Sequence, residues 1–197
     1  GQSRPFKGQN NNTFITGQGH EIEQGLNNTS VIGGAYGKVL RQSEVLIGGG
    51  AVGLGDDAVS GLTQTSMLQL SGSTTNATET NLSIQGDGSS YIVVQTNSLL
   101  AFECHVNALV TGGADGTTGH YRYEKIVGTI LVNNSGTRTY NQTTTTVKSN
   151  GTVGATATTL TNTGDDVTLL VVGTANTNVQ WYASIILIEN KLATVTF

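Results

Sequence analysis

The sequence has few charged residues. Asp, Glu, Lys and Arg make up 11% of its 197 residues, against roughly 25% in an ordinary soluble domain. The net charge is -4, and the nine basic residues are scattered singly along the chain. Because binding to nucleic-acid phosphates needs clustered lysine and arginine, this pattern argues against a nucleic-acid partner.

Cysteine and long apolar runs are also scarce. The single cysteine, Cys104, excludes a disulfide within one chain, and the alternating pattern around it predicts a small core residue. No run approaches the roughly 20 apolar residues of a membrane-spanning helix. Residues 1–12 lack the basic segment followed by an apolar one that marks a secretory signal. We therefore expect no membrane insertion.

Thr, Ser, Asn, Gln and Gly take the place of the missing charges, as in the run of four threonines at residues 143–146. Threonine favours strands because its Cβ is branched, whereas Asn and Gly favour the turns between strands. Helix signals are nearly absent. The composition predicts an ordered all-β protein with many short strands and tight connections.

A short repeat occupies the first part of the chain. An Ile-x-Gly unit, followed five residues after the glycine by another aliphatic residue, occurs three times, at Ile15-Gly17-Ile22, Ile32-Gly34-Val39 and Ile47-Gly49-Leu54. Steps of 17 and 15 residues are too short for any helical repeat. The repeat predicts a thin glycine-rich β-coil, a shaft or collar over residues 1–60. One turn of such a coil buries too little apolar surface alone, so we expect stacking and a homo-oligomer.

The hydrophobic pattern of the sequence changes after residue 60. Segments with an alternating or wholly apolar pattern are separated by turn clusters, which predicts about eight to ten strands in a second domain over residues 61–197. An antiparallel sandwich fits this spacing, and the jelly roll is the favoured arrangement. The predicted strands cover residues 67–70, 82–85, 91–95, 99–111, 121–133, 137–140, 144–148, 155–160, 167–173 and 179–189.

Two of these strands are apolar on both faces. Leu170 and Val172 alternate with the apolar residues of one strand, and Tyr182, Ile186 and Ile188 alternate with those of the last strand. A strand that is apolar on both faces must be covered on both. We predict that these five residues contact a neighbouring subunit, with a long loop as the alternative cover.

The sequence resembles the trimeric fibre proteins of viruses. The Asn-Thr-Ser-Val-Ile-Gly-Gly piece at residues 28–34, with partners at 12–17 and 43–49, resembles β-roll repeats in the heads of trimeric bacterial adhesins and the shafts of trimeric phage fibres. The segments at 90–95, 99–111, 166–173 and 178–189 are similar to the C-terminal head domains of phage tail fibres and related virion proteins, which resemble the TNF-like jelly roll.

The resemblance implies a homotrimer in an extracellular virion fibre or spike, beside other virion tail proteins. Such a tip would attach the particle to a host cell-surface glycan or protein, without enzymatic activity or a cofactor. The absence of a heptad pattern favours a virion fibre over a cell-anchored adhesin. The alternatives are a glycan-degrading tailspike, a self-cleaving maturation domain, and a purely structural trimer of a virion or cell surface.

The favoured binding candidate is the glycine-rich loop at residues 112–119 with the cluster that follows it. Aromatic rings stack on sugars, and arginine forms bidentate hydrogen bonds. We predict that Arg138 and Tyr140 lie near this cluster. The alternative is that the tyrosines only cap the sandwich edge. The candidate residues are His120, Tyr121, Arg122, Tyr123, Arg138 and Tyr140.

No catalytic constellation stands out. The acidic residues are mostly single and lie in turn contexts, and no Gly-x-Ser-x-Gly element is present. His20, His105 and His120 lack the paired spacing of a zinc site. In a trimer, His20 on the threefold axis would supply three imidazoles to one ion, whereas the alternative is an ordinary surface or core histidine. We expect no catalytic residues and no metal.

Overall fold

The computed structural model describes residues 12–50, 59–153 and 158–192. Within these ranges the protein consists of strands β1 to β13 and contains no helix, so none that could span a membrane. The predicted all-β class is confirmed. Parallel and antiparallel pairs occur in one extended mixed sheet, which makes its first three strands different in kind from the rest.

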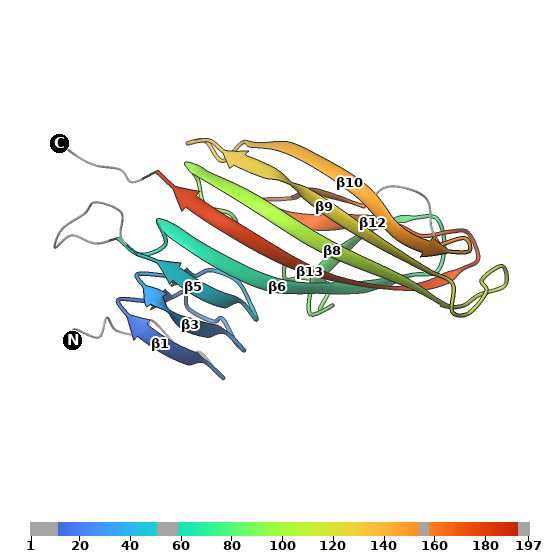
Figure 1. The fold of residues 1–197 in the computed structure, drawn as a ribbon, viewed down its shortest axis with the longest axis horizontal. Helices are drawn as coiled ribbons and strands as arrows, with labels where there is room; N and C mark the ends of the chain where they lie inside the picture. Colours follow the sequence, from blue (N-terminus) through green and yellow to red (C-terminus); the bar gives the residue numbers. More distant parts are fainter. Residues whose placement is uncertain (1–11, 51–58, 154–157, 193–197) are drawn as a thin grey trace.

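The first strands form the predicted coil. β1 (Phe14–Gln18), β3 (Ser30–Ala35) and β5 (Val45–Gly49) stack side by side as parallel strands. β2 (Glu21–Ile22) and β4 (Lys38–Val39) form a second parallel ladder. Figure 1 shows the first ladder as the blue part of the ribbon. Within the described residues, the first two turns of the chain each supply one strand to each ladder.

The register of the coil differs from the predicted repeat by one residue. Ile15 pairs with Val31, and Val31 pairs with Leu46. Val31 and Leu46 are fully buried, whereas Ile32 and Ile47 are 51% and 44% exposed. The register shifts at irregularities within both strand pairs. The spacing is therefore not constant along a turn, and aligning the isoleucines alone chose the outward residues.

A column of glycines lets the turns stack closely. A Cβ on Gly17 would overlap the carbonyl oxygen of Gly34, and a Cβ on Gly34 would overlap that of Gly48. Gly34 also has a φ of +78°, in the left-handed region that glycine adopts without strain. Two of the three repeat glycines are thus in the predicted column, and Gly48 takes the place that the repeat gave to Gly49.

The remaining strands form a two-layer sandwich. The coil continues into the larger sheet in the order β5-β6-β13-β8-β9-β10, and the smaller layer has the order β7-β12-β11 (Figure 1). The strands are β6 (Thr63–Thr74), β7 (Glu79–Ile84), β8 (Ser98–Gly112), β9 (Tyr121–Val132), β10 (Arg138–Asn150), β11 (Thr159–Thr163), β12 (Asp166–Val172) and β13 (Asn178–Lys191).

One apolar core lies between the two layers. Alternate residues of β8 and β13 point inward, as in Phe102, Cys104 and Ile185, and meet Leu82 and Leu169 of the smaller layer. Cys104 is fully buried, which confirms its predicted place in the core. Burying alternate residues on one face leaves the other face of each sheet outside.

Three predicted strands differ from the observed ones. Residues 91–95 form no strand, and Ile92 makes only an isolated bridge to Val167. The two strands predicted at 137–140 and 144–148 are one continuous strand, β10, because residues 141–143 between them stay paired with β9. Residues 155–157 of another predicted strand lie outside the described residues.

The coil and the sandwich share one sheet. β5 pairs with β6 through Val45 and Met67, so the hydrogen-bonded ladder runs without a break from the coil into the larger sheet. The predicted boundary near residue 60 falls just before β6. A small separate core of Ile22, Val31, Val39 and Leu46 lies inside the coil.

Candidate functional site

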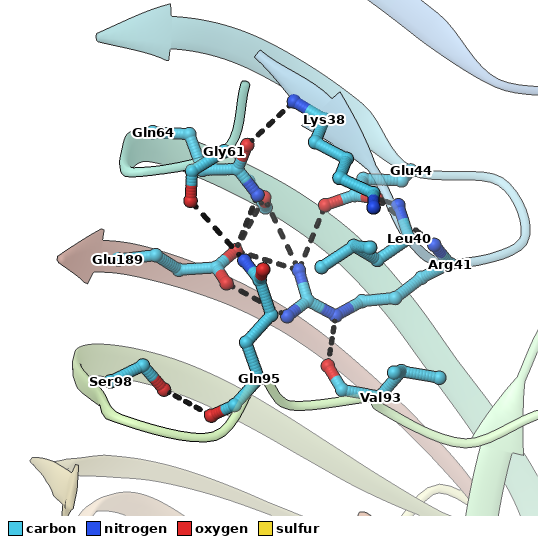
Figure 2. Close-up of polar contacts among 11 residues, drawn as sticks. Lys38, Leu40, Arg41, Glu44, Gly61, Gln64, Val93, Gln95, Ser98 and Glu189 are labelled. Carbon is cyan, nitrogen blue, oxygen red and sulfur yellow. Dashed lines mark hydrogen bonds and ion pairs between the residues drawn. The ribbon is translucent and has the colours of Figure 1, made fainter. Parts of the chain in front are cut away.

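A buried ion cluster fixes the coil to the sandwich. Arg41, between β4 and β5, donates from Nη1 to Glu44 at 2.8 Å and to Glu189 of β13 at 2.7 Å (Figure 2). Its Nη2 reaches the second oxygen of Glu189 at 3.0 Å, and its Nε donates to the carbonyl of Val93 at 2.7 Å. Arg41 and Glu44 have no exposed side-chain surface.

The carboxylates of the cluster are hydrogen-bonded as well. Glu189 accepts from the hydroxyl of Ser66 at 2.9 Å and from the amide of Gln64 at 3.3 Å. Burial would lower the pKa of Arg41, but the two carboxylates raise it above its ordinary value. Burial would raise the pKa of Glu189, but Arg41 and these donors hold it below its usual range. Both groups are therefore charged at neutral pH, and their ion pair links the coil to the sandwich.

Two loops of the sandwich lie at the end away from the coil. The β8–β9 loop projects at the opposite end of the molecule from β1, β3 and β5 (Figure 1). Its Asp115 accepts from the side-chain amide of Asn176 at 2.9 Å, and the amide of Asp115 donates to the carbonyl of Asn176 at 3.1 Å. These bonds tie the β8–β9 loop to the β12–β13 loop. The end distal to the coil is thus held in place.

Three tyrosines lie on the outer face of the larger sheet near this distal end. Tyr121 pairs with Leu109, which pairs with Gln180. One rung nearer the coil, Tyr123 pairs with Asn107, which pairs with Tyr182. Directly paired residues point to the same side of a sheet, so all of these side chains share the outer face. We call this group the distal platform: Asn107, Leu109, Tyr121, Tyr123, Gln180 and Tyr182.

A shallow hollow of about 610 Å³ opens on the platform. Tyr182, Leu109 and Asn107 line it on one side, and the turn at Gln85 and Gly86 lines it on the other. No charged side chain lines the hollow. Tyrosine offers an apolar ring face and a polar hydroxyl, while amides and serine hydroxyls donate and accept hydrogen bonds. This lining suits a neutral polar ligand rather than an ion.

Tyr123 is held by the side chain of His105. Its hydroxyl lies 2.6 Å from Nδ1 of His105, and the two rings stack with centroids 5.9 Å apart and an angle of 14° between their planes. The other ring nitrogen of His105 contacts Glu103 at 2.8 Å, and Glu103 also pairs with Lys125 at 2.8 Å. Hydrogen bonds thus fix Tyr123, whereas Tyr121 and Tyr182 are 41% and 43% exposed.

Arg122 does not share the outer face with Tyr121 and Tyr123. It alternates with the outward tyrosines and therefore points into the sandwich, where it pairs with Glu124. Glu124 is 2% exposed and also accepts hydrogen bonds from Thr146 and Thr158. The prediction that Arg122 lies with Tyr121 and Tyr123 ignored the alternation of a strand, which places neighbours in sequence on opposite faces.

Arg138 and Tyr140 lie far from Tyr121. Arg138 pairs with Val132 at one end of the β9–β10 ladder, while Tyr121 pairs with Asn150 at the other end. Arg138 donates to the carbonyl of Asp165, in the turn between β11 and β12. The prediction that these residues cluster was wrong, because a hairpin with strands this long separates its two ends by roughly 35 Å.

Tyr140 and His120 have structural contacts. The hydroxyl of Tyr140 donates to Asn162 at 2.6 Å, and its ring packs against the core. The His120 ring lies over Gly151, where a Cβ would overlap the imidazole. His120 is half-buried at the distal end, and its amide donates to the carbonyl of Thr117. Of the six predicted binding residues, Tyr121 and Tyr123 are those on the outer face.

His20 lies within the coil. Its Nδ1 accepts from the amide of Gly37 at 3.0 Å, and its Nε2 is buried close to Gly17. Neither nitrogen points away from the chain, so this geometry does not present three imidazoles to a shared axis. In the described ranges, no group of three His, Cys, Asp or Glu residues is placed to hold a metal ion.

The five predicted interface residues occupy two opposite surfaces. Tyr182, Ile186 and Ile188 point outward from β13 in the larger sheet. Leu170 and Val172 are half-buried and alternate with the core residues of β12, so they lie outside the smaller layer. The predicted two-faced pattern of both strands is thus present, but the five residues do not form one patch.

No family model matches the chain, and neither a curated protein nor a solved structure matches it. The basis for a function is therefore the geometry of the distal platform and its place on the molecule. Sequence reasoning missed Asn107, Gln180 and the hollow. Their signal was the strand alternation, which gave the outward residues of β8 and β13 but not which strands were neighbours.

Proposed function

We propose that this chain is the distal part of a trimeric viral fibre that attaches the particle to a host cell-surface glycan or protein. The observation that carries the proposal is the position of the distal platform, at the end of the molecule opposite to the coil (Figure 1). A surface at that end is the first part of a projecting rod to meet a cell.

The joint between coil and sandwich supports this reading. A continuous sheet and the buried Arg41–Glu189 pair hold the two regions in one orientation, so the platform is presented at a fixed angle to the coil. Weak binding at each platform suffices for attachment, because several copies on one particle multiply the effective affinity. The uncharged hollow favours a neutral glycan over an anionic one.

A TNF-like jelly roll assembled as a homotrimer belongs to the same proposal. The pairing of β6 with β13 and of β7 with β12 supports a rolled sandwich. The strands β8, β9 and β10 instead follow one another as consecutive hairpins in one sheet. The proposal includes an extracellular location on the virion and contacts with other virion tail proteins.

The test is a glycan array combined with binding to whole cells. Tyr182→Ala and Tyr121→Ala should each reduce binding at least tenfold without lowering the thermal unfolding temperature by more than a few degrees. Arg138→Ala, at the other end of the β9–β10 ladder, should lower stability and leave binding by the folded protein unchanged. Wild-type protein that binds no glycan and no cell would favour the purely structural trimer.

The enzymatic alternatives give different products. A glycan-degrading tailspike would shorten host polysaccharide during incubation, and a self-cleaving maturation domain would yield two fragments in a mass spectrum. We expect intact polysaccharide and one intact chain. Shortened polysaccharide or a cleaved chain would show that the protein is an enzyme and would contradict attachment as its main activity.

A further inference from the structure

The outer face of the larger sheet carries a group of exposed apolar side chains at its coil end. It spans both the coil and the sandwich, and each of its residues is 43% to 59% exposed. We call it the assembly face: Phe14, Ile47, Met67, Leu99, Leu131 and Ile188.

The strand register joins these residues. Ile47 pairs with Thr65, and Thr65 pairs with Ile188. One rung away, Met67 pairs with Val45, and Phe14 lies in line with them through Ser30. Because paired residues share a face, the assembly face crosses from β1 to β9, with the polar residues Ser30, Thr65 and Asn190 between its apolar side chains. A group of large exposed apolar side chains on one face is typical of a surface that contacts another protein.

The charges of the assembly face are also compatible with packing against a second copy of the same face. Glu103 lies in the rung of Met67 and Lys125 lies in the next rung, and their side chains pair with each other at 2.8 Å within one chain. Identical faces brought together therefore do not place unpaired like charges against each other. The threonines of β10, among them Thr139 and Thr143, form a polar rim on one side.

The area is close to that of a stable contact. With seven strands about 4.8 Å apart and five residues per strand at about 3.3 Å each, the face covers roughly 550 Å². A partner in a standard-size interface contributes about 800 Å², so the face supplies most of such a contact. The outer surface of the smaller layer exposes less apolar area, because its apolar residues Leu170 and Val172 are already half-buried.

We infer that copies of this chain pack against one another through the assembly face, so that coil and sandwich share a single intersubunit contact. This inference rests on the proposed trimeric fibre and names the surface that holds it together. It retains Ile188 from the predicted interface and omits Leu170 and Val172. The distal platform stays beyond the contact, separated from the assembly face by the polar rung of Gln69, Ser184, His105 and Lys125.

A charge placed on the face tests the inference in the intact chain. Ile188→Asp and Ile47→Asp should each lower the molar mass measured by light scattering from the oligomer to the monomer at micromolar concentration. Val147→Asp is the matched control, because Val147 is 46% exposed on β10 but lies outside the face. It should leave the oligomer unchanged, and circular dichroism should show the same strand content in all three variants.

A cysteine provides a second test that does not depend on weakening the assembly. Ile188→Cys should give disulfide-linked chains on a non-reducing gel after mild oxidation, while the wild type, with its buried Cys104, should not. Val147→Cys should cross-link at least tenfold more slowly.

The outcomes separate the two proposals. A trimeric wild type whose mass resists both aspartates and whose Ile188→Cys variant does not cross-link would overturn the assembly face and leave the fibre in place. A monomeric wild type would overturn both. A stable dimer sensitive to Ile188→Asp would keep the face and overturn the trimer. If an aspartate variant does not fold, the cross-linking of Ile188→Cys decides whether the assembly face is correct.

Discussion

The carboxylate of Glu189 receives both terminal nitrogens of Arg41, at 2.7 and 3.0 Å, although 148 residues separate the two in sequence. Glu189 belongs to the last strand of the sandwich, and Arg41 belongs to the coil. The pair is buried, and its remaining donors and acceptors are hydrogen-bonded. It therefore couples the stability of the coil to that of the sandwich.

Replacing Arg41 by methionine should destabilise the whole molecule. The change leaves Glu44 and Glu189 buried without their cation, and breaking a buried ion pair in this way costs about 3–5 kcal/mol. Urea unfolding measures the loss. Lys38→Met is the control, since its partner Glu23 is half exposed and such pairs contribute at most about 1 kcal/mol. Equal losses in the two variants would show that the cluster is not the joint.

Stability should fall in acid through Glu189. Its folded pKa lies below its ordinary value, so the unfolded chain binds more protons in acid and stability rises with pH. The contribution is complete above the unfolded pKa, near about 4.3, and is lost as the pH falls through the lowered folded pKa.

Unfolding at a series of pH values checks this dependence. Glu189→Gln should flatten the acid limb and lower stability at neutral pH. Glu103→Gln is a control on the surface, where Lys125 and His105 lower the pKa of a solvent-exposed carboxylate. Its effect should be much smaller. An unchanged acid limb in Glu189→Gln would contradict the assigned role of the carboxylate.

Gly34→Ala should damage the coil more than Gly25→Ala. Both glycines have a positive φ, +78° and +82°, so both variants incur the same backbone strain. Only at Gly34 would the new methyl group overlap a backbone atom, the carbonyl oxygen of Gly48, whereas Gly25 faces open space. The difference in unfolding free energy should be about 1–3 kcal/mol. Equal effects would mean that the turns are not stacked as described.

Cys104 should be unreactive in the folded protein. Burial raises the pKa of its thiol to about 12, so almost no thiolate is present at pH 8. Modification by a chromogenic disulfide reagent should be at least about a hundredfold slower in native buffer than in denaturant, where one thiol per chain reacts. Rapid modification in native buffer would show that the larger sheet opens at its centre.

Sequence patterns predicted the features that local chemistry controls. The glycine and isoleucine spacing revealed the coil, and the alternation around Cys104 revealed a core strand. The patterns failed for contacts that depend on where a residue lies along a long strand, or on pairing between segments that are distant in sequence. Arg138 was placed near Tyr121 because their strands follow one another, yet long strands carry their ends apart. The isoleucine alignment missed the bulges that shift the register.

Part of the candidate site could be predicted from the sequence. Tyr121 and Tyr123 were found because they follow the glycine-rich loop at residues 112–119 in a cluster of aromatic and basic residues. Gln180 and Asn107 reach the same platform from β13 and β8, whose pairing is a property of the sheet order and not of either segment. The Arg41–Glu189 contact has no local signal at all, since each residue alone reads as an ordinary surface charge.

The stacking of one coil turn on the next allows the length of the coil to change by whole turns. Each turn meets its neighbours through the same glycine column and the same parallel ladder. A turn is therefore a unit that evolution or an engineer is able to duplicate or delete whole, which lengthens or shortens the coil by about 4.8 Å while the distal end of the sandwich keeps its shape.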